Sequence, residues 1–249
     1  MTIRVLVSIC IMYLFSFASA LPQDGSKTGS FVSKSTSTAL MGEEIAASYS
    51  AFLGADEEIE WEIHVPANYS PDNPPGILVY VSPQNRINVP TGWTNVTEEN
   101  NLIWIAARMS GNEINVLKRI SFAVMSLSLI DLNYQIDPAR IFISGFSGGG
   151  RIASIVATEY PTIFKGAIYN SGVNFWQQSN PDLLELIKNH RYVFVTGTDD
   201  FNLRDTRQVY NKYKKAGAKN IKLTVIRGMG HENPKRSRFA RAIEFLDEN

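Results

Sequence analysis

Short apolar runs alternate with longer amphipathic segments through the second half of the chain. The runs have the length and composition of strands that are buried on both faces: 141–144, 166–169, 192–196 and 221–226. In the segments between them apolar residues recur every three or four positions, which predicts helices over 149–159, 181–188, 203–216 and 235–246. Repeated strand–helix units require a mostly parallel sheet with helices on both faces.

The first half of the chain predicts the remaining strands. Residues 45–52 and 59–65 show rough period-two alternation and are expected to form an antiparallel pair. Residues 77–81 and 102–106 are continuous apolar runs, and residues 113–132 are long and helix-like. The Asp137-Pro138 pair ends that helical region. These elements predict an α/β fold around an eight-stranded sheet.

The N-terminus has the pattern of an export signal. Arg4 precedes an apolar run over 5–18, and Ala18-Ser19-Ala20 is a small-x-small site. The run is short for a membrane span, so a signal peptide over 1–20 is favoured over an uncleaved anchor. Residues 21–42, rich in Ser, Thr, Gly and Lys up to about 38, are expected to be a linker, and 43–249 the folded domain. The mature protein is therefore predicted to be secreted or periplasmic, with no stable membrane anchor.

Composition excludes several functional classes. The chain has 249 residues, and its 24 basic and 24 acidic residues give no electrostatic footprint for nucleic acid. Its single cysteine, Cys10, lies within the predicted signal peptide, so neither a disulfide nor a cysteine-based metal cluster is expected. His-Glu-x-x-His is also missing from the sequence. We therefore expect neither a metal nor another cofactor.

The strongest local motif is Gly145-Phe146-Ser147-Gly148-Gly149. It lies between a predicted strand and a predicted helix, which is the setting of the G-x-S-x-G turn that presents a nucleophilic serine. The helix N-terminus that follows offers backbone N–H groups to a developing oxyanion. A dinucleotide loop does not fit, because Ser147 occupies the second glycine position of G-x-G-x-x-G. A simple tight turn is the remaining alternative.

A nucleophilic serine needs a base and an acid that orients the base. His64 lies on an early strand, and His190 precedes a strand and so belongs to the opposite edge of the sheet. His231 follows the last predicted strand, at the edge that carries Ser147, and is the predicted base. Asp199 and Asp200 both follow the strand 192–196 at that same edge, and either could be the acid.

With serine, aspartate and histidine in this order, the chain resembles the α/β-hydrolase superfamily from about residue 45 to its end. The compact exported form is most similar to polyhydroxybutyrate depolymerases and to feruloyl or acetylxylan esterases, which carry no large cap. The resemblance implies acyl transfer: Ser147 attacks the acyl carbon, His231 carries the proton and an aspartate orients the imidazole. The Gly-x-x-Asp spacing of such relatives favours Asp200 over Asp199.

The chain departs from these relatives beside the predicted nucleophile. Many of them carry His-Gly after the strand that corresponds to 77–81, where this chain has Ser82-Pro83-Gln84-Asn85. Pro83 has no N–H to donate. Gly148 is the expected first oxyanion donor, and Gln84 is the expected second.

Aromatic residues after the strand 166–169 are candidates for the substrate site. Phe175 and Trp176 could bind substrate, or they could close the edge of the core. The predicted function is a secreted carboxylic-ester hydrolase that acts on a small or polymeric ester. The alternatives are a serine peptidase or lipase, or a binding protein that uses the same fold without catalysis.

Overall fold

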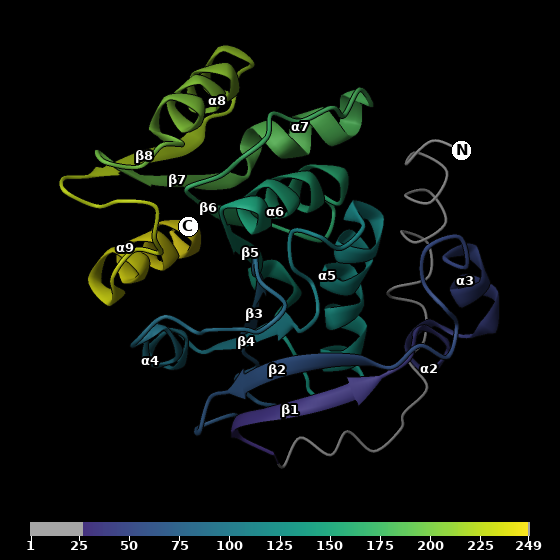
Figure 1. Cartoon of the computed structure of the whole chain (residues 1–249). Helices are drawn as coiled ribbons and strands as arrows, with labels where there is room; N and C mark the ends of the chain where they lie inside the picture. The colour runs from purple at the N-terminus through teal and green to yellow at the C-terminus, as the bar shows by residue number, and fades with distance from the viewer. Residues whose placement is uncertain (1–26, 249) are drawn as a thin grey trace.

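The computed structural model describes residues 27–248. Its centre is one eight-stranded sheet in the order β1-β2-β4-β3-β5-β6-β7-β8 (Figure 1). β2 is antiparallel to both its neighbours, β1 and β4, and every pair from β4 to β8 is parallel. The strands are β1 (Gly29–Ser35), β2 (Ile59–Val65), β3 (Gly76–Val81), β4 (Leu102–Ala107), β5 (Ile141–Phe146), β6 (Gly166–Asn170), β7 (Arg191–Gly197) and β8 (Asn220–Ile226).

Helices cover both faces of the sheet, as the alternating pattern predicts. The larger core packs the sheet against α2 (Ser37–Met41), α3 (Glu43–Ser48), α5 (Val116–Asp131), α6 (Gly148–Glu159), α7 (Pro181–Asn189) and α8 (Leu203–Lys215). The smaller core packs the other face against α4 (Trp93–Glu99) and α9 (Arg236–Asp247). Along β3, Val79 faces the larger core and its neighbours Leu78 and Tyr80 face the smaller one. A short 3₁₀ turn, Pro138–Arg140, leads into β5.

The structure confirms the strands and helices predicted in the second half of the chain. The N-terminal region differs from the prediction. The predicted strand at 45–52 is wrong: it falls on α3 and the turn that follows. The strand that pairs with β2 is instead β1, inside the segment predicted to be a linker. Side chains along β1 alternate between exposed and half-buried positions because it is an edge strand, so its apolar signal is weak. The predicted signal peptide, 1–20, lies outside the described residues.

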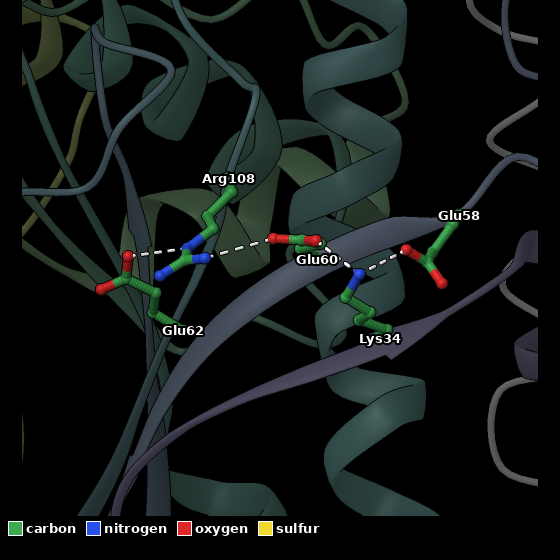
Figure 2. Close-up of polar contacts among 5 residues, drawn as sticks. All are labelled: Lys34, Glu58, Glu60, Glu62 and Arg108. Carbon is green, nitrogen blue, oxygen red and sulfur yellow. Dashed lines mark hydrogen bonds and ion pairs between the residues drawn. The ribbon is translucent and has the colours of Figure 1, made fainter.

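A row of alternating charges ties β1 to the sheet (Figure 2). Lys34 Nζ lies 2.7 Å from Glu58 Oε1 and 2.8 Å from Glu60 Oε1. Arg108, just after β4, bridges Glu60 and Glu62 at 3.2 and 2.9 Å. Hydrogen bonds from Lys34 and Arg108 hold the pKa of Glu60 below its usual range. Because these side chains face solvent, their main contribution is to the register of the edge strand.

No helix among residues 27–248 is long and apolar enough to cross a membrane.

The smaller core is centred on Trp93, at the start of α4. Its side chain is fully buried and stacks on Phe239 of α9, with ring centroids 3.7 Å apart and planes 2° from parallel. The indole Nε1–H donates to the carbonyl of Pro234 at 3.0 Å. The contact fixes α4 against α9 and the segment that leads into α9, and that segment follows His231.

We expect Trp93→Ala to lower the free energy of unfolding by about 3–5 kcal/mol, because it leaves a cavity against Phe239. Urea denaturation would measure the change. Val116→Ala is the control, because Val116 is 47% exposed and its replacement should change stability by no more than about 0.5 kcal/mol. A loss for Trp93→Ala as small as that of the control would contradict this account of the smaller core.

Candidate active site

Ser147 sits at the turn between β5 and α6, in a backbone conformation that side chains seldom adopt. Its φ is 53° and its ψ is −120°, outside the common allowed regions. Its N–H donates to the carbonyl of Asn170 on the neighbouring strand at 2.8 Å, which holds the turn against the sheet. The side chain is partly exposed at the carboxyl edge of the sheet, where a substrate can reach it.

The flanking glycines are required by space. A Cβ on Gly145 would lie 2.3 Å from the carbonyl oxygen of Gly149, and a Cβ on Gly149 would lie 2.0 Å from the carbonyl oxygen of Val81. Both distances are far below van der Waals contact, so any side chain would push α6 away from the sheet. The strand–turn–helix setting that the motif predicts is therefore present.

The structure brings Ser147, His231 and Asp200 into one hydrogen-bonded chain. His231 Nε2 lies 2.9 Å from Ser147 Oγ, and His231 Nδ1 lies 2.9 Å from Asp200 Oδ1. The three residues follow β5, β8 and β7 and meet at the carboxyl edge of the sheet, as the sequence predicts. This is the geometry in which an imidazole takes a proton from a serine hydroxyl while a carboxylate holds its orientation.

Asp200, rather than Asp199, contacts the imidazole. Its side chain is 0% exposed, and it accepts hydrogen bonds from the Thr196 hydroxyl and the Asn202 N–H, each at 2.9 Å. Burial acts to raise the pKa of the Asp200 carboxyl, but donors around it, Ser171 and Asn202 foremost, outweigh burial and hold that pKa below its usual range. Asp200 is thus an ionised partner for the imidazole, whereas Asp199 is exposed and accepts from the Thr198 hydroxyl.

His64 belongs to a second row of hydrogen-bonded serine, histidine and carboxylate groups, whose serine lies in a different structural position from Ser147. Its Nδ1 lies 2.8 Å from Ser30 Oγ, and its Nε2 lies 2.7 Å from Glu98 Oε2. Ser30, however, lies within β1, with neither a strained turn nor a helix N-terminus beside it. We therefore assign this row a structural role that links β1, β2 and α4.

His190 also lies away from Ser147. It caps the C-terminus of α7 at the opposite edge of the sheet, where its N–H donates to the carbonyl of Leu186. Burial lowers the pKa of its imidazole to about 4.

Two aromatic rings flank the His231 imidazole. The ring centroid of Phe201 lies 4.1 Å from that of His231, and the centroid of Phe146 lies 4.9 Å from it. Phe201 is 75% exposed, the most exposed large apolar side chain among the described residues. An apolar surface therefore stands beside the imidazole that would protonate a leaving group.

Two groups of Gln84, the predicted second oxyanion donor, are engaged in the loop after β3. Its N–H donates to the Ser82 hydroxyl at 3.0 Å, and its side-chain oxygen accepts from Asn88. Gly148 is the first residue of α6, so its N–H has no partner within the helix, as the prediction requires. Asn112, in the loop after β4, lies against Gly148.

Trp176 is buried in the core and Phe175 is half-buried against it, which favours the predicted alternative that they close the core edge. Trp176 is 9% exposed and packs edge-on against Tyr213 of α8 at 4.5 Å. Phe175 stacks on Trp176 at 4.3 Å and also contacts Tyr213. The alternative, that they close the core edge, is the arrangement found, because burying the rings under α8 removes their large apolar area from water.

Two residues at the site, Phe201 beside His231 and Asn112 beside Gly148, are missing from the sequence prediction. Phe201 directly follows the predicted acid, so its position alone could have indicated a contact with His231. Asn112 has no local motif, but it follows a parallel strand and therefore belongs to the carboxyl edge. Among residues 27–248, no group of three or more histidine, cysteine, aspartate or glutamate side chains could hold a metal ion.

Comparison with known proteins supports the fold. The sequence profile of the prolyl oligopeptidase family matches residues 122–229, which is less than half of the chain. No curated protein sequence is significantly similar to the chain.

Solved structures match over most of the described residues. A ferulic acid esterase aligns with a TM-score of 0.63 and 13% identity, over 88% of this chain and 100% of its own. A feruloyl esterase module from Clostridium thermocellum, complexed with sinapinate, aligns with a TM-score of 0.60 and 13% identity, over 91% of this chain and 92% of its own. A protein of Bacteroides ovatus described as a dipeptidyl aminopeptidase IV aligns with a TM-score of 0.58 and 17% identity, over 92% of this chain.

The chain spans only 36% of the length of that Bacteroides ovatus structure. The identities are low, so these likenesses concern the fold alone. Together with the strand order and the turn that carries Ser147, they lead to one conclusion: the chain has the α/β-hydrolase fold and carries a serine–histidine–aspartate triad.

Proposed function

We propose that this protein is a serine hydrolase that cleaves carboxylic esters through an acyl-serine intermediate. The observation that carries the proposal is the continuous hydrogen-bonded chain from Ser147 through His231 to Asp200. The first residue of α6 adds a free backbone N–H at the position where negative charge would develop.

The triad performs the reaction in two balanced halves. With its proton on Nδ1, the imidazole of His231 accepts the Ser147 hydroxyl proton at Nε2 while Oγ bonds to the acyl carbon. The tetrahedral intermediate then expels the alcohol, which takes the proton from Nε2, and the acyl group remains on Oγ. Water, deprotonated by the same nitrogen, next attacks the acyl carbon, and Oγ regains its proton as the acid leaves.

The surroundings of His231 favour an apolar leaving group. The expelled alcohol must lie beside Nε2, and the exposed ring of Phe201 packs on the same imidazole. The structural neighbours add support, because the two feruloyl esterase structures are matched over 100% and 92% of their lengths. The acyl group, and whether the natural ester is small or polymeric, stay open in this proposal.

A serine peptidase is the second candidate, because the profile that matches residues 122–229 is that of the prolyl oligopeptidase family. We favour the esterase because the exposed ring of Phe201 packs on the His231 imidazole, where the leaving alcohol of an ester would lie. The two activities use the same triad and differ in the leaving group, so substrate choice separates them.

We also propose that the protein is exported, on the basis of the signal-like pattern of residues 1–20. N-terminal sequencing of protein recovered from outside the cytoplasm would test cleavage before Leu21. A mature N-terminus at Met1 would contradict the proposal.

The purified protein should hydrolyse p-nitrophenyl esters, from acetyl to octanoyl, and should release little p-nitroaniline from Gly-Pro-p-nitroanilide. Ser147→Ala should abolish turnover and should also abolish labelling by a fluorophosphonate, since both require the serine hydroxyl. Turnover of the anilide without turnover of the esters would favour the peptidase. A folded wild-type protein that neither turns over esters nor reacts with the phosphonate would refute the proposed hydrolase.

Asp200→Asn should lower kcat on the order of 10⁴-fold, because an amide that donates to Nδ1 holds the imidazole in the wrong tautomer. Asp199→Asn is the matched control and should retain almost full activity, because its carboxylate faces solvent. Steady-state kinetics with p-nitrophenyl acetate would measure both. Equal losses in the two variants would contradict the assignment of the acid.

Phe201→Ala should lower kcat/KM for phenyl acetate about 3- to 10-fold more than for methyl acetate, because an aromatic leaving group loses its stacking partner. Leu132→Ala is the control: Leu132 is 43% exposed and lies at the end of α5, away from the carboxyl edge. Equal effects on the two esters would indicate that Phe201 merely supports His231.

A further inference from the structure

The loop after β3 does not provide an obvious second oxyanion donor. Pro83 has no N–H, and the Gln84 N–H already donates to the Ser82 hydroxyl at 3.0 Å. Acyl transfer through a tetrahedral intermediate ordinarily uses at least two aligned donors. Neither residue 83 nor residue 84 therefore has a backbone N–H available to complement the Gly148 N–H, and the side chain that lies against Gly148 comes from a neighbouring loop.

The carboxamide of Asn112 occupies the space beside Gly148. A Cβ on Gly148 would lie 2.0 Å from Asn112 Oδ1, 2.7 Å from Cγ and 3.0 Å from Nδ2. The carboxamide of another loop thus fills the space that a side chain at position 148 would take. The three heavy atoms nearest to that position all belong to Asn112.

Backbone contacts fix where Asn112 sits. The Asn112 N–H donates to the carbonyl of Pro83 at 3.0 Å, and the Met109 N–H donates to the carbonyl of Asn85 at 2.8 Å. The Gly111 N–H donates to the Asn85 side-chain oxygen at 2.9 Å. The loops after β3 and β4 are therefore joined directly beside the nucleophile turn.

Arg119 fixes which way the carboxamide faces. Arg119 is 4% exposed, and its Nη1 donates to Asn112 Oδ1 at 3.4 Å while its Nη2 donates to the carbonyl of Ser82 at 3.0 Å. Because Oδ1 is turned toward a cation, the amide nitrogen is turned away from it. Within residues 27–248, Asn112 Nδ2 has no hydrogen-bond partner, so both of its N–H groups are available to a ligand.

We propose that the Asn112 side-chain amide is the second oxyanion donor, acting with the Gly148 N–H on the tetrahedral intermediate formed at Ser147. The inference rests on the proposed function and assigns a catalytic residue that lies 35 positions before the nucleophile in the sequence. Arg119 and the joined loops orient this amide before substrate arrives, as an efficient oxyanion donor requires.

Steady-state kinetics of Asn112→Ala and Asn112→Asp with p-nitrophenyl acetate would test the proposal. A trifluoromethyl ketone, which forms a tetrahedral adduct with a nucleophilic serine, would report directly on the oxyanion site. Asn88→Ala is the matched control, because Asn88 is an exposed amide in the loop after β3. Thermal unfolding of each variant would separate a catalytic loss from a folding defect.

We expect Asn112→Ala to lower kcat about 10²-fold with little change in KM, and to weaken ketone binding by a similar factor. Asn112→Asp should lose at least as much, because a carboxylate of the same size repels the oxyanion. Asn88→Ala should behave as wild type, and the melting temperatures should be unchanged.

An Asn112→Ala variant that keeps the wild-type kcat and ketone affinity would overturn this inference while leaving the proposed hydrolase intact. The same holds for a variant that changes KM alone. A wild-type protein without serine-dependent turnover or phosphonate labelling would instead overturn the proposed function, and the present inference with it.

Discussion

The backbone of Ser147 is the constraint on which the site depends. Its positive φ lifts the hydroxyl above the sheet, and the chain can turn into α6 only if the neighbouring backbones approach closely. A Cβ on Gly172 would lie 2.1 Å from the Ser147 carbonyl oxygen, and a Cβ on Gly150 would lie 2.2 Å from that of Gly172. The glycines around the turn thus allow β5, α6 and the loop after β6 to pack closely together. This packing holds the Ser147 backbone in its strained conformation.

Electrostatics then link two separate loops, those after β7 and β8, to that turn. The Asp200 carboxylate is removed from solvent, and such a charge is stable only because hydroxyl and amide donors surround it. His231 spans from this carboxylate to the serine, with Phe146 and Phe201 against its ring. Aromatic packing limits the positions that the imidazole can take, so the base is oriented before any substrate is bound.

The two sides of the nucleophile differ in chemistry. Beside His231 the surface is apolar and exposed, whereas beside Gly148 it is polar, with the Asn112 amide held in front of the buried Arg119 guanidinium. Burial lowers the pKa of Arg119, although Glu113 acts in the opposite direction. The Ser30–His64–Glu98 chain has the same order of groups, but its serine lies within an edge strand and not at a strand–helix turn, so we assign it a structural role.

The parallel half of the sheet, the turn at Ser147 and the positions of His231 and the two aspartates could be predicted from the chain alone. These features depend on local periodicity, on the space that a tight turn leaves and on the shared edge of parallel strands. The N-terminal elements could not be predicted in the same way: β1 is a half-exposed edge strand with little apolar signal, and residues 45–52 fit a strand and a helix about equally well.

Only the tertiary structure could decide contacts between segments that are distant in sequence. It placed Asp200, which the resemblance already favoured, against His231, because one carboxylate of the adjacent pair is buried toward the imidazole and the other faces solvent. It packed Trp176 and the half-buried Phe175 against Tyr213, and it brought Phe201 and Asn112 to the site. Residue identity and local pattern therefore determined the available chemistry, whereas long-range packing determined which side chains surround the serine, because burial and loop-to-loop contacts have no local sequence pattern.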